Sequence, residues 1–253
     1  MFYGGKGWIL KRWMGISVAL LLLLSAAGCA GEVEVPGMER SLFAMNTYMT
    51  FTVYGGEAEE ALEEAEQLIQ KVESLWSVTD EDSEIYQANH SGGRPMTVSK
   101  ETADLISFAL EMAHETDGAL EPTLYPVLTA WGFTTDSKQV PSREQITELL
   151  QQVDYSRIQL EGNSLTVPEG MQLDLGAVGK GYAADLVTEG LKKHHVESAI
   201  LSLGGNIQAI GSRQDGTDWR IGIRAPWEDG NLGVLEISDA AVVTSGGYEN
   251  YFE

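Results

Sequence analysis

One stretch of the sequence places an acid, three glycines and a lysine close together. In "LDLGAVGKGYAADLV", Asp174 lies between two leucines and is followed by Gly176, Gly179, Lys180 and Gly181. An acid beside apolar residues needs a hydrogen-bond donor or a cation as its partner. A glycine turn that leads into a helix directs backbone N–H groups and the positive end of the helix dipole at an anion, and a lysine adds a positive charge. These residue types therefore suit the binding of a phosphate group.

The spacing of the glycines excludes both common nucleotide-binding loops. A P-loop has four residues between its glycines and a Ser or Thr after the lysine, whereas Gly181 follows Lys180 here. The dinucleotide pattern G-x-G-x-x-G fails too, because these glycines are spaced G-x-x-G-x-G. Two interpretations stay open on the residues alone. The stretch is an anion-binding turn, or it is a tight strand-to-helix turn with an exposed lysine and with Asp174 as a capping acid.

The elements that would position this stretch are a strand, "QLDL", ending at Leu175, and a helix from about Gly179 to His194. Apolar periodicity predicts a strand over residues 46–55 and an amphipathic helix over 57–76. Ser99 and Ser142 are typical N-caps of two further helices, and Gln145 completes a capping-box pattern. A hairpin with its turn at Gly162-Asn163 and several strand-like runs follow: "SAILSLG", "NIQAIG", "WRIGIRA", "LGVLEIS" and "AAVVTSG". Helices gather in the first half and strands in the second, which favours an α+β fold.

Two other segments could contact a ligand. The turn Gly204-Gly205-Asn206 allows close approach to the backbone, although most such turns only reverse the chain. The segment "TDGALEPTLYPVLTAWGF" forms an irregular apolar loop around Glu121 and Thr123, which suits a pocket wall or core packing under a loop. The four histidines show no metal-ligand spacing, so a zinc site is not supported.

Length and charge limit the function classes. The chain has 253 residues with 43% hydrophobic content and a formal charge of −22, which is sufficient for a substantial core. Loss of the three positive charges of residues 1–28 would bring the charge to about −25. Nucleic acids and anionic membrane surfaces are poor partners for such a chain. A polyanionic ligand would need local backbone N–H groups, a metal ion or a few well-placed cations.

Residues 1–28 are predicted to be a secretory leader. Basic residues precede the apolar run "MGISVALLLLLSAAG", which ends directly before Cys29. Cys29 is the single cysteine of the sequence, and "AAGC" is similar to a lipoprotein cleavage site with Ala26 where Leu is more common. We therefore expect lipidation of Cys29, the alternative being an ordinary signal peptide. Residues 29–40 are interpreted as a tether, and residues 41–253 as one domain that lacks a C-terminal piece, since "ENYFE" ends without a cap.

The motifs in their order resemble the ApbE family of flavin transferases, from about Met45 to the last residue. "MNTYMTFTVYG" is similar to the family's opening M-G-T and strand, and "SVTDEDSEIYQAN" to its D-S-E-I-S-R-x-N segment. "GALEPTLYPVLTAWGF" resembles its G-A-F-D-P-T and W-G-F segments. The later matching blocks are "LDLGAVGKGYAAD", "LSLGGNIQAIG", "WRIGIRAP" and "VVTSGGYENYF".

The resemblance implies a T-fold-like α+β architecture and a transferase that uses FAD and Mg²⁺. Such enzymes cleave FAD, release AMP, and leave FMN esterified through its phosphate to a Thr or Ser hydroxyl of a target redox protein. With the leader, this predicts a membrane-anchored lipoprotein outside the bacterial cytoplasm. The alternatives are an FAD-binding lipoprotein without catalysis and an FAD hydrolase that yields FMN and AMP.

The resemblance also assigns roles to individual residues. Asp174 and Lys180 are the expected catalytic residues and hold the cofactor, and the carbonyl oxygen of Ala177 is an expected metal ligand. The remaining expected FAD contacts are Met45, Thr79, Ala119, Leu120, Glu121, Gly204, Gly205 and Asn206.

Three departures from the family pattern are visible. Glu121 replaces the more common Asp, and Thr79 stands where many relatives have a flavin-side Tyr. Relatives continue into a His-Ile-x-Asp-Pro segment followed by an Asp and a Thr near the metal, which this sequence does not contain. If the chain ends at Glu253, we expect an incomplete metal site and weak transfer.

Overall fold

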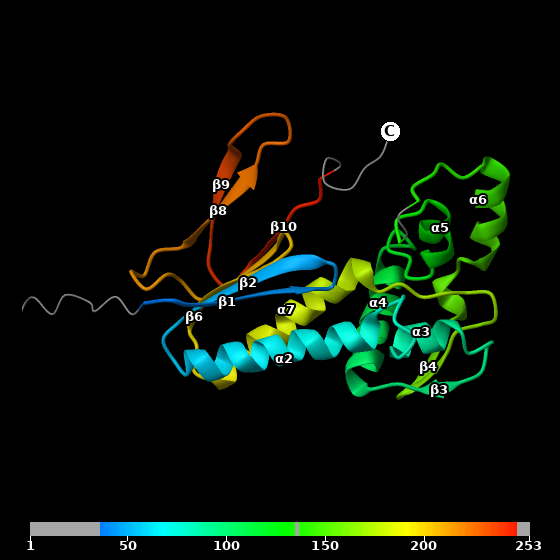
Figure 1. Cartoon of the computed structure of the whole chain (residues 1–253), viewed down its shortest axis with the longest axis horizontal. Helices are drawn as coiled ribbons and strands as arrows, with labels where there is room; N and C mark the ends of the chain where they lie inside the picture. The colour runs from blue at the N-terminus through cyan, green and yellow to red at the C-terminus, as the bar shows by residue number, and fades with distance from the viewer. Residues whose placement is uncertain (1–35, 135–136, 247–253) are drawn as a thin grey trace, which may run out of the picture. The chain divides into compact units, whose positions relative to one another are not determined.

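The computed structural model describes residues 36–134 and 137–246. The predicted leader, Cys29 and the last residues of the chain lie outside these ranges. From Gly37 onward the chain forms one compact unit. Its helices pack against antiparallel sheets, so the predicted α+β class is confirmed (Figure 1). Within the described residues, no helix combines the length and the apolar character needed to cross a bilayer.

The main sheet has five antiparallel strands in the order β1-β2-β6-β7-β10. Their bounds are Met38–Ala44, Thr47–Tyr54, Ser198–Leu203, Asn206–Ile210 and Ala241–Val243. Alternation along β2 buries Met49, Phe51 and Val53 completely, because every second side chain faces the helices. Strand β1 begins at Met38, so the last residues assigned to the tether belong to the sheet.

Six helices are found within the described residues: α2 (Ala58–Trp76), α3 (Glu84–Asn89), α4 (Lys100–Glu115), α5 (Tyr125–Ala130), α6 (Arg143–Leu149) and α7 (Gly176–Lys193). The two long helices α2 and α7 pack on each other, and both contact the main sheet (Figure 1). The apolar stripe of α2 is buried there, as the periodicity predicts. The N-cap predictions are confirmed, since Ser99 accepts the N–H of Thr102 and Ser142 accepts the N–H of Gln145.

Two smaller sheets complete the unit. One contains β3 (Met96–Thr97), β5 (Ser164–Thr166) and β4 (Gln159–Glu161), in that order, and the predicted hairpin joins β4 to β5. The other pairs β8 (Trp219–Arg224) with β9 (Asn231–Ile237). Two short 3-10 turns, at Leu150–Gln152 and Tyr155–Arg157, precede β4.

Three local predictions are wrong. "QLDL" is not a strand, because its backbone groups bond to the side chain of Asn89 and the carbonyl of Pro122 instead of a neighbouring strand. Helix α7 begins at Gly176, not near Gly179, so the glycines lie inside the helix. The short helix α5 occupies a segment predicted to be an irregular loop, and it is too short for clear periodicity.

Candidate functional site

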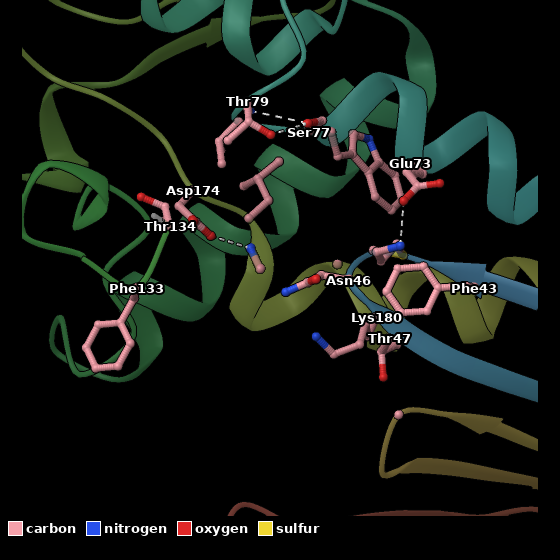
Figure 2. A pocket seen from close by; sticks show the side chains of 17 residues that line it. Phe43, Asn46, Thr47, Glu73, Ser77, Thr79, Phe133, Thr134, Asp174 and Lys180 are labelled. Atoms are coloured by element: carbon pink, nitrogen blue, oxygen red, sulfur yellow. Dashed lines mark hydrogen bonds between the residues drawn. The ribbon is translucent and has the colours of Figure 1, made fainter. Parts of the chain in front are cut away.

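A cavity of about 910 Å³ lies where six segments meet: the β1–β2 turn with the end of β1, the end of α2, the residues that follow α5, the residues that precede α7, the beginning of α7, and the β6–β7 turn. Figure 2 shows its polar and aromatic side chains projecting from these segments. Its polar and charged lining side chains are Asn46, Thr47, Glu73, Ser77, Thr79, Thr134, Asp174 and Lys180. Its lining also includes Phe43, Met45, Trp76, Val78, Phe133, Leu175 and three glycines. A cavity of this size with a few convergent polar groups is typical of a small-molecule site.

Asp174 caps the beginning of α7. Its Oδ1 accepts the backbone N–H of Gly176 at 2.6 Å, which satisfies one of the unpaired donors of the first turn. The carbonyl of Leu175 accepts the N–H groups of Val178 and Gly179. The expected fan of free N–H groups is therefore mostly occupied, and Ala177 has the one first-turn N–H without a hydrogen bond to another described residue. Asp174 is therefore a capping acid whose side chain also lines the cavity, and anion binding at this turn stays a prediction.

Distant segments hold Asp174 in place. The side-chain amide of Asn89 donates to the carbonyl of Leu173 at 2.9 Å and accepts its N–H at 2.7 Å. The N–H of Asp174 donates to the carbonyl of Pro122 at 2.8 Å. The backbone on both sides of the Asp174 side chain is thereby fixed without a β-ladder, and this places the carboxylate at the edge of the cavity.

Lys180 is half-buried and projects from α7 into the cavity (Figure 2). It is the basic residue among the described lining residues, whereas Glu73 and Asp174 supply two carboxylates. No carboxylate of residues 36–134 or 137–246 forms an ion pair with it. Its ammonium group is therefore available to a negatively charged ligand, and it lies on the helix whose positive dipole end faces the same space.

The β1–β2 turn forms another wall of the cavity. Met45 and Asn46 both have positive φ values, 49° and 58°, and the N–H of Met45 donates to Oε1 of Glu73 at 2.7 Å. Gly179 leaves room for the Met45 side chain, because a Cβ there would lie 3.3 Å from its methyl group. The sequence motif "MNT" therefore lines the same cavity as Asp174 and Lys180.

Ser77 stabilises the part of the cavity wall that follows α2. Its Oγ accepts the backbone N–H groups of Thr79 and Asp80 at 3.2 and 3.0 Å. Thr79 is exposed and lines the cavity, and its contact with FAD stays a prediction. Phe43 and Phe133 supply exposed aromatic rings at the cavity, although no sequence signal distinguishes them from other apolar residues.

Several predicted contact residues lie outside this lining. The Glu121 carboxylate accepts the N–H and hydroxyl of Thr123 and the N–H of Tyr155, so it joins its own loop to the 3-10 turn at Tyr155. Gly204 lines the cavity, whereas Gly205 and Asn206 continue into β7. Ala119, Leu120 and Ala177 are also absent from the lining. The assignment of these residues to FAD or metal stays a prediction.

Few protein groups at this cavity could bind a metal ion. Within the described residues, no three His, Cys, Asp or Glu side chains gather closely enough to hold a metal ion. Ala177 is the second residue of α7, where a carbonyl ordinarily accepts the N–H four residues later, so ligation would use its other lone pair. A metal ion at this cavity would need oxygen ligands in addition to Asp174.

Glu73 is the lining residue that sequence reasoning missed most clearly. It is one of many glutamates on α2, and nothing in its spacing separates it from those that face solvent. Only the fold shows that it faces the β1–β2 turn.

Comparison with known proteins gives a consistent result. The model of the ApbE family matches residues 45–253. An FAD:protein FMN transferase of Treponema pallidum is 33% identical, the match covering 94% of this chain and 72% of that protein. One from Vibrio cholerae is 30% identical, with 96% and 75% covered. The crystal structure of the ApbE protein of Thermotoga maritima superimposes with a TM-score of 0.81 at 31% identity, over 86% of this chain and 73% of that one. The apo flavinyl transferase ApbE of Pseudomonas stutzeri gives 0.78 at 28% identity, over 87% and 71%.

Proposed function

The chain belongs to the ApbE family, and we propose on this basis that it is an FAD:protein FMN transferase, an enzyme that moves FMN from FAD to a target protein. The observation that carries the proposal is the meeting of Met45, Asp174 and Lys180 in one cavity. These residues come from distant parts of the sequence and belong to the motifs on which the resemblance depends. The cavity volume of about 910 Å³ suits a ligand of dinucleotide size.

The proposed reaction exchanges the phosphoanhydride bond of FAD for a phosphoester bond to the target protein. The oxygen of a Thr or Ser hydroxyl on the target attacks the phosphorus of the FMN half of FAD. The bond from that phosphorus to the bridging oxygen breaks, AMP departs with the bridging oxygen, and the hydroxyl proton is lost. Phosphoryl transfer of this type is promoted mainly by positioning and by stabilisation of negative charge.

Lys180 and the beginning of α7 are the groups suited to that negative charge. The Lys180 ammonium has no carboxylate partner among the described residues, so it can face a phosphate oxygen directly. The helix dipole adds a weaker attraction, about 0.3–1 kcal/mol. Lys180 and the helix dipole offset the acidic character of the rest of the chain, whose formal charge is −22.

Mg²⁺ fits the residues that are present if phosphate oxygens complete its coordination. Asp174 would hold the ion, because its Oδ1 is used by Gly176 while Oδ2 accepts no hydrogen bond from residues 36–134 or 137–246. One carboxylate, with the carbonyl of Ala177 as the second predicted ligand, is the small protein contribution that Mg²⁺ at a phosphate site usually has. When bound, the ion would neutralise the charge that develops on the phosphates.

We also propose that the protein acts outside the bacterial cytoplasm as a lipoprotein anchored through Cys29. The proposal depends on the apolar leader and on the small residues directly before Cys29. A lipid anchor would keep the flavin transferase domain close to membrane-bound redox proteins. Mass spectrometry of Cys29 in the membrane fraction tests this part, with Cys29→Ser as the control.

The decisive experiment for transfer mixes the protein with FAD, MgCl₂ and a target protein that carries a Thr or Ser acceptor. In-gel flavin fluorescence of the target and release of AMP are expected together, and an acceptor Thr→Val variant should remain unlabelled. AMP without labelled target would instead identify an FAD hydrolase. FAD binding without either product would identify a flavin-binding protein, and both results contradict transfer.

A further inference from the structure

The β1–β2 turn has an unusual backbone for the residues it contains. Met45 and Asn46 both adopt left-handed conformations, with φ values of 49° and 58°. This is the geometry of a tight hairpin turn that favours Asn and Gly, and asparagine accepts it readily. Methionine does not, because its Cβ crowds the backbone in this region. The surroundings must therefore hold Met45 in place.

The side chain of Glu73 forms a strong hydrogen bond with the backbone of Met45. Glu73 of α2 is half-buried, and its Oε1 accepts the N–H of Met45 at 2.7 Å. A short hydrogen bond to a carboxylate is stronger than one between neutral groups. Trp76 lies one helical turn after Glu73 and packs beside Gly179, so α2 and α7 enclose the turn together.

The turn contributes directly to the proposed substrate site. Met45, Asn46 and Thr47 all line the cavity, as does Glu73. A turn that relaxes would move three lining residues at once, while the strands on either side of it would keep their pairing.

We propose that Glu73 is a positioning residue that holds the Met45-Asn46 turn in the conformation that binds FAD. The proposal rests on the proposed function for the identity of the ligand. Glu73 acts through the backbone of Met45 and by accepting a hydrogen bond.

The test measures FAD affinity by calorimetry for a set of variants. Glu73→Leu should raise the Kd for FAD about tenfold, as expected for loss of one charge-assisted hydrogen bond. Glu73→Gln keeps an acceptor and should stay within about threefold of the wild type. Glu63→Leu is the matched control, since Glu63 is an exposed glutamate of the same helix outside the cavity, and it should bind FAD normally.

A rescue experiment separates positioning from a general structural role. Asn46→Gly lowers the cost of the left-handed turn, so Glu73→Leu/Asn46→Gly should bind FAD at least about threefold more tightly than Glu73→Leu alone. Should Glu73→Leu fail to fold, Glu73→Asp takes its place, because the shorter side chain keeps the charge but ends too far from the N–H. Normal FAD affinity of Glu73→Leu or Glu73→Asp, weak binding by Glu73→Gln, or absence of rescue would each overturn the proposal.

The experiments distinguish a failure of the proposed transferase function from a failure of the proposal for Glu73. Hydrogen exchange of the peptide that spans the β1–β2 turn needs no FAD, and it should be faster in Glu73→Leu than in Glu63→Leu. A wild-type protein that neither binds FAD nor transfers FMN would contradict the proposed function, and the exchange rates would still decide whether Glu73 holds the turn. Unchanged exchange in Glu73→Leu would show that it does not.

Discussion

The side-chain amide of Asn89 forms two hydrogen bonds with the backbone of Leu173, donating to its carbonyl and accepting its N–H. One side chain on α3 thus replaces the strand that would otherwise pair with this segment. Asp174 comes next in the chain, so Asn89 determines where the carboxylate of the candidate site lies. Asn89 is the last residue of the segment "SVTDEDSEIYQAN", one of the segments on which the family resemblance depends.

Replacement of Asn89 by Ala should destabilise the protein by about 2–3 kcal/mol, because two partly buried backbone groups lose their partners. FAD affinity should fall as well, since Asp174 is no longer held. Urea unfolding and calorimetry measure the two effects. Gln87→Ala, an exposed change on the same helix, should alter neither. A stable Asn89→Ala protein would show that water replaces both hydrogen bonds.

Two substitutions at Asp174 separate its capping role from its proposed metal role. Asp174→Asn keeps an oxygen that accepts the N–H of Gly176, so stability should be close to that of the wild type while Mg²⁺-dependent transfer is largely lost. Asp174→Ala should lose transfer and also about 1 kcal/mol of stability. Initial rates as a function of Mg²⁺ concentration, together with unfolding curves, test this pair. If Asp174→Asn transfers FMN normally, the acid is only a helix cap.

Lys180→Ala should raise the Kd for FAD about tenfold, because a phosphate loses its charged partner in the cavity. The affinity of the variant should also depend less on salt than that of the wild type. Lys192→Ala provides the control, since Lys192 is exposed at the opposite end of the same helix. Equal affinities and salt dependences for wild type and Lys180→Ala would place the diphosphate elsewhere.

Gly204 and Gly205 form a matched pair for testing the contact between the β6–β7 turn and the β1–β2 turn. Both have positive φ, at 63° and 91°, so Ala at either position costs about 1–2 kcal/mol of backbone strain. A Cβ at Gly204 would also overlap the Thr47 side chain, whereas at Gly205 its nearest contact is at 4.0 Å. Gly204→Ala should therefore be the more destabilising change, by more than about 2 kcal/mol. Equal thermal unfolding of the two variants would mean that the turns separate freely.

His194, which lies outside the cavity lining, should make the stability of the fold depend on pH. Its imidazole bonds to Glu64 at 2.7 Å and to Glu57 at 3.0 Å, and these two carboxylates raise its pKa. The folded state therefore holds the proton more tightly than the unfolded state. The resulting stability is fully present below the unfolded pKa of about 6.5 and is lost as the pH rises through the higher folded pKa.

Unfolding free energies of His194→Gln and the wild type should thus differ more at about pH 6 than at about pH 8. His114→Gln, a change at an exposed histidine of α4, should show no such convergence. A difference between wild type and His194→Gln that does not vary with pH would mean that the pair with Glu64 contributes nothing as an ion pair.

Local sequence signals predicted the elements whose side chains repeat regularly. The alternation that buries Phe51 and the periodicity that buries Ile69 identify β2 and α2 directly. Ser99 and Ser142 mark helix starts because a cap uses a side chain and a backbone group only three residues apart. The start of α7 was misplaced, because its glycines suggested a turn while the Asp174 cap allows the helix to begin at Gly176.

The sequence by itself determined the fold class, the family motifs and the identity of Asp174 and Lys180 as candidate site residues. These depend on residue types and on spacings within one segment. Only the tertiary structure decided that Glu73 faces Met45, that Asn89 holds Leu173, and that Glu121 accepts the N–H of Tyr155. Nothing in the local sequence pattern distinguishes these residues from other polar residues of the same helices and loops. Their partners are fixed by packing between distant segments, which local periodicity does not encode.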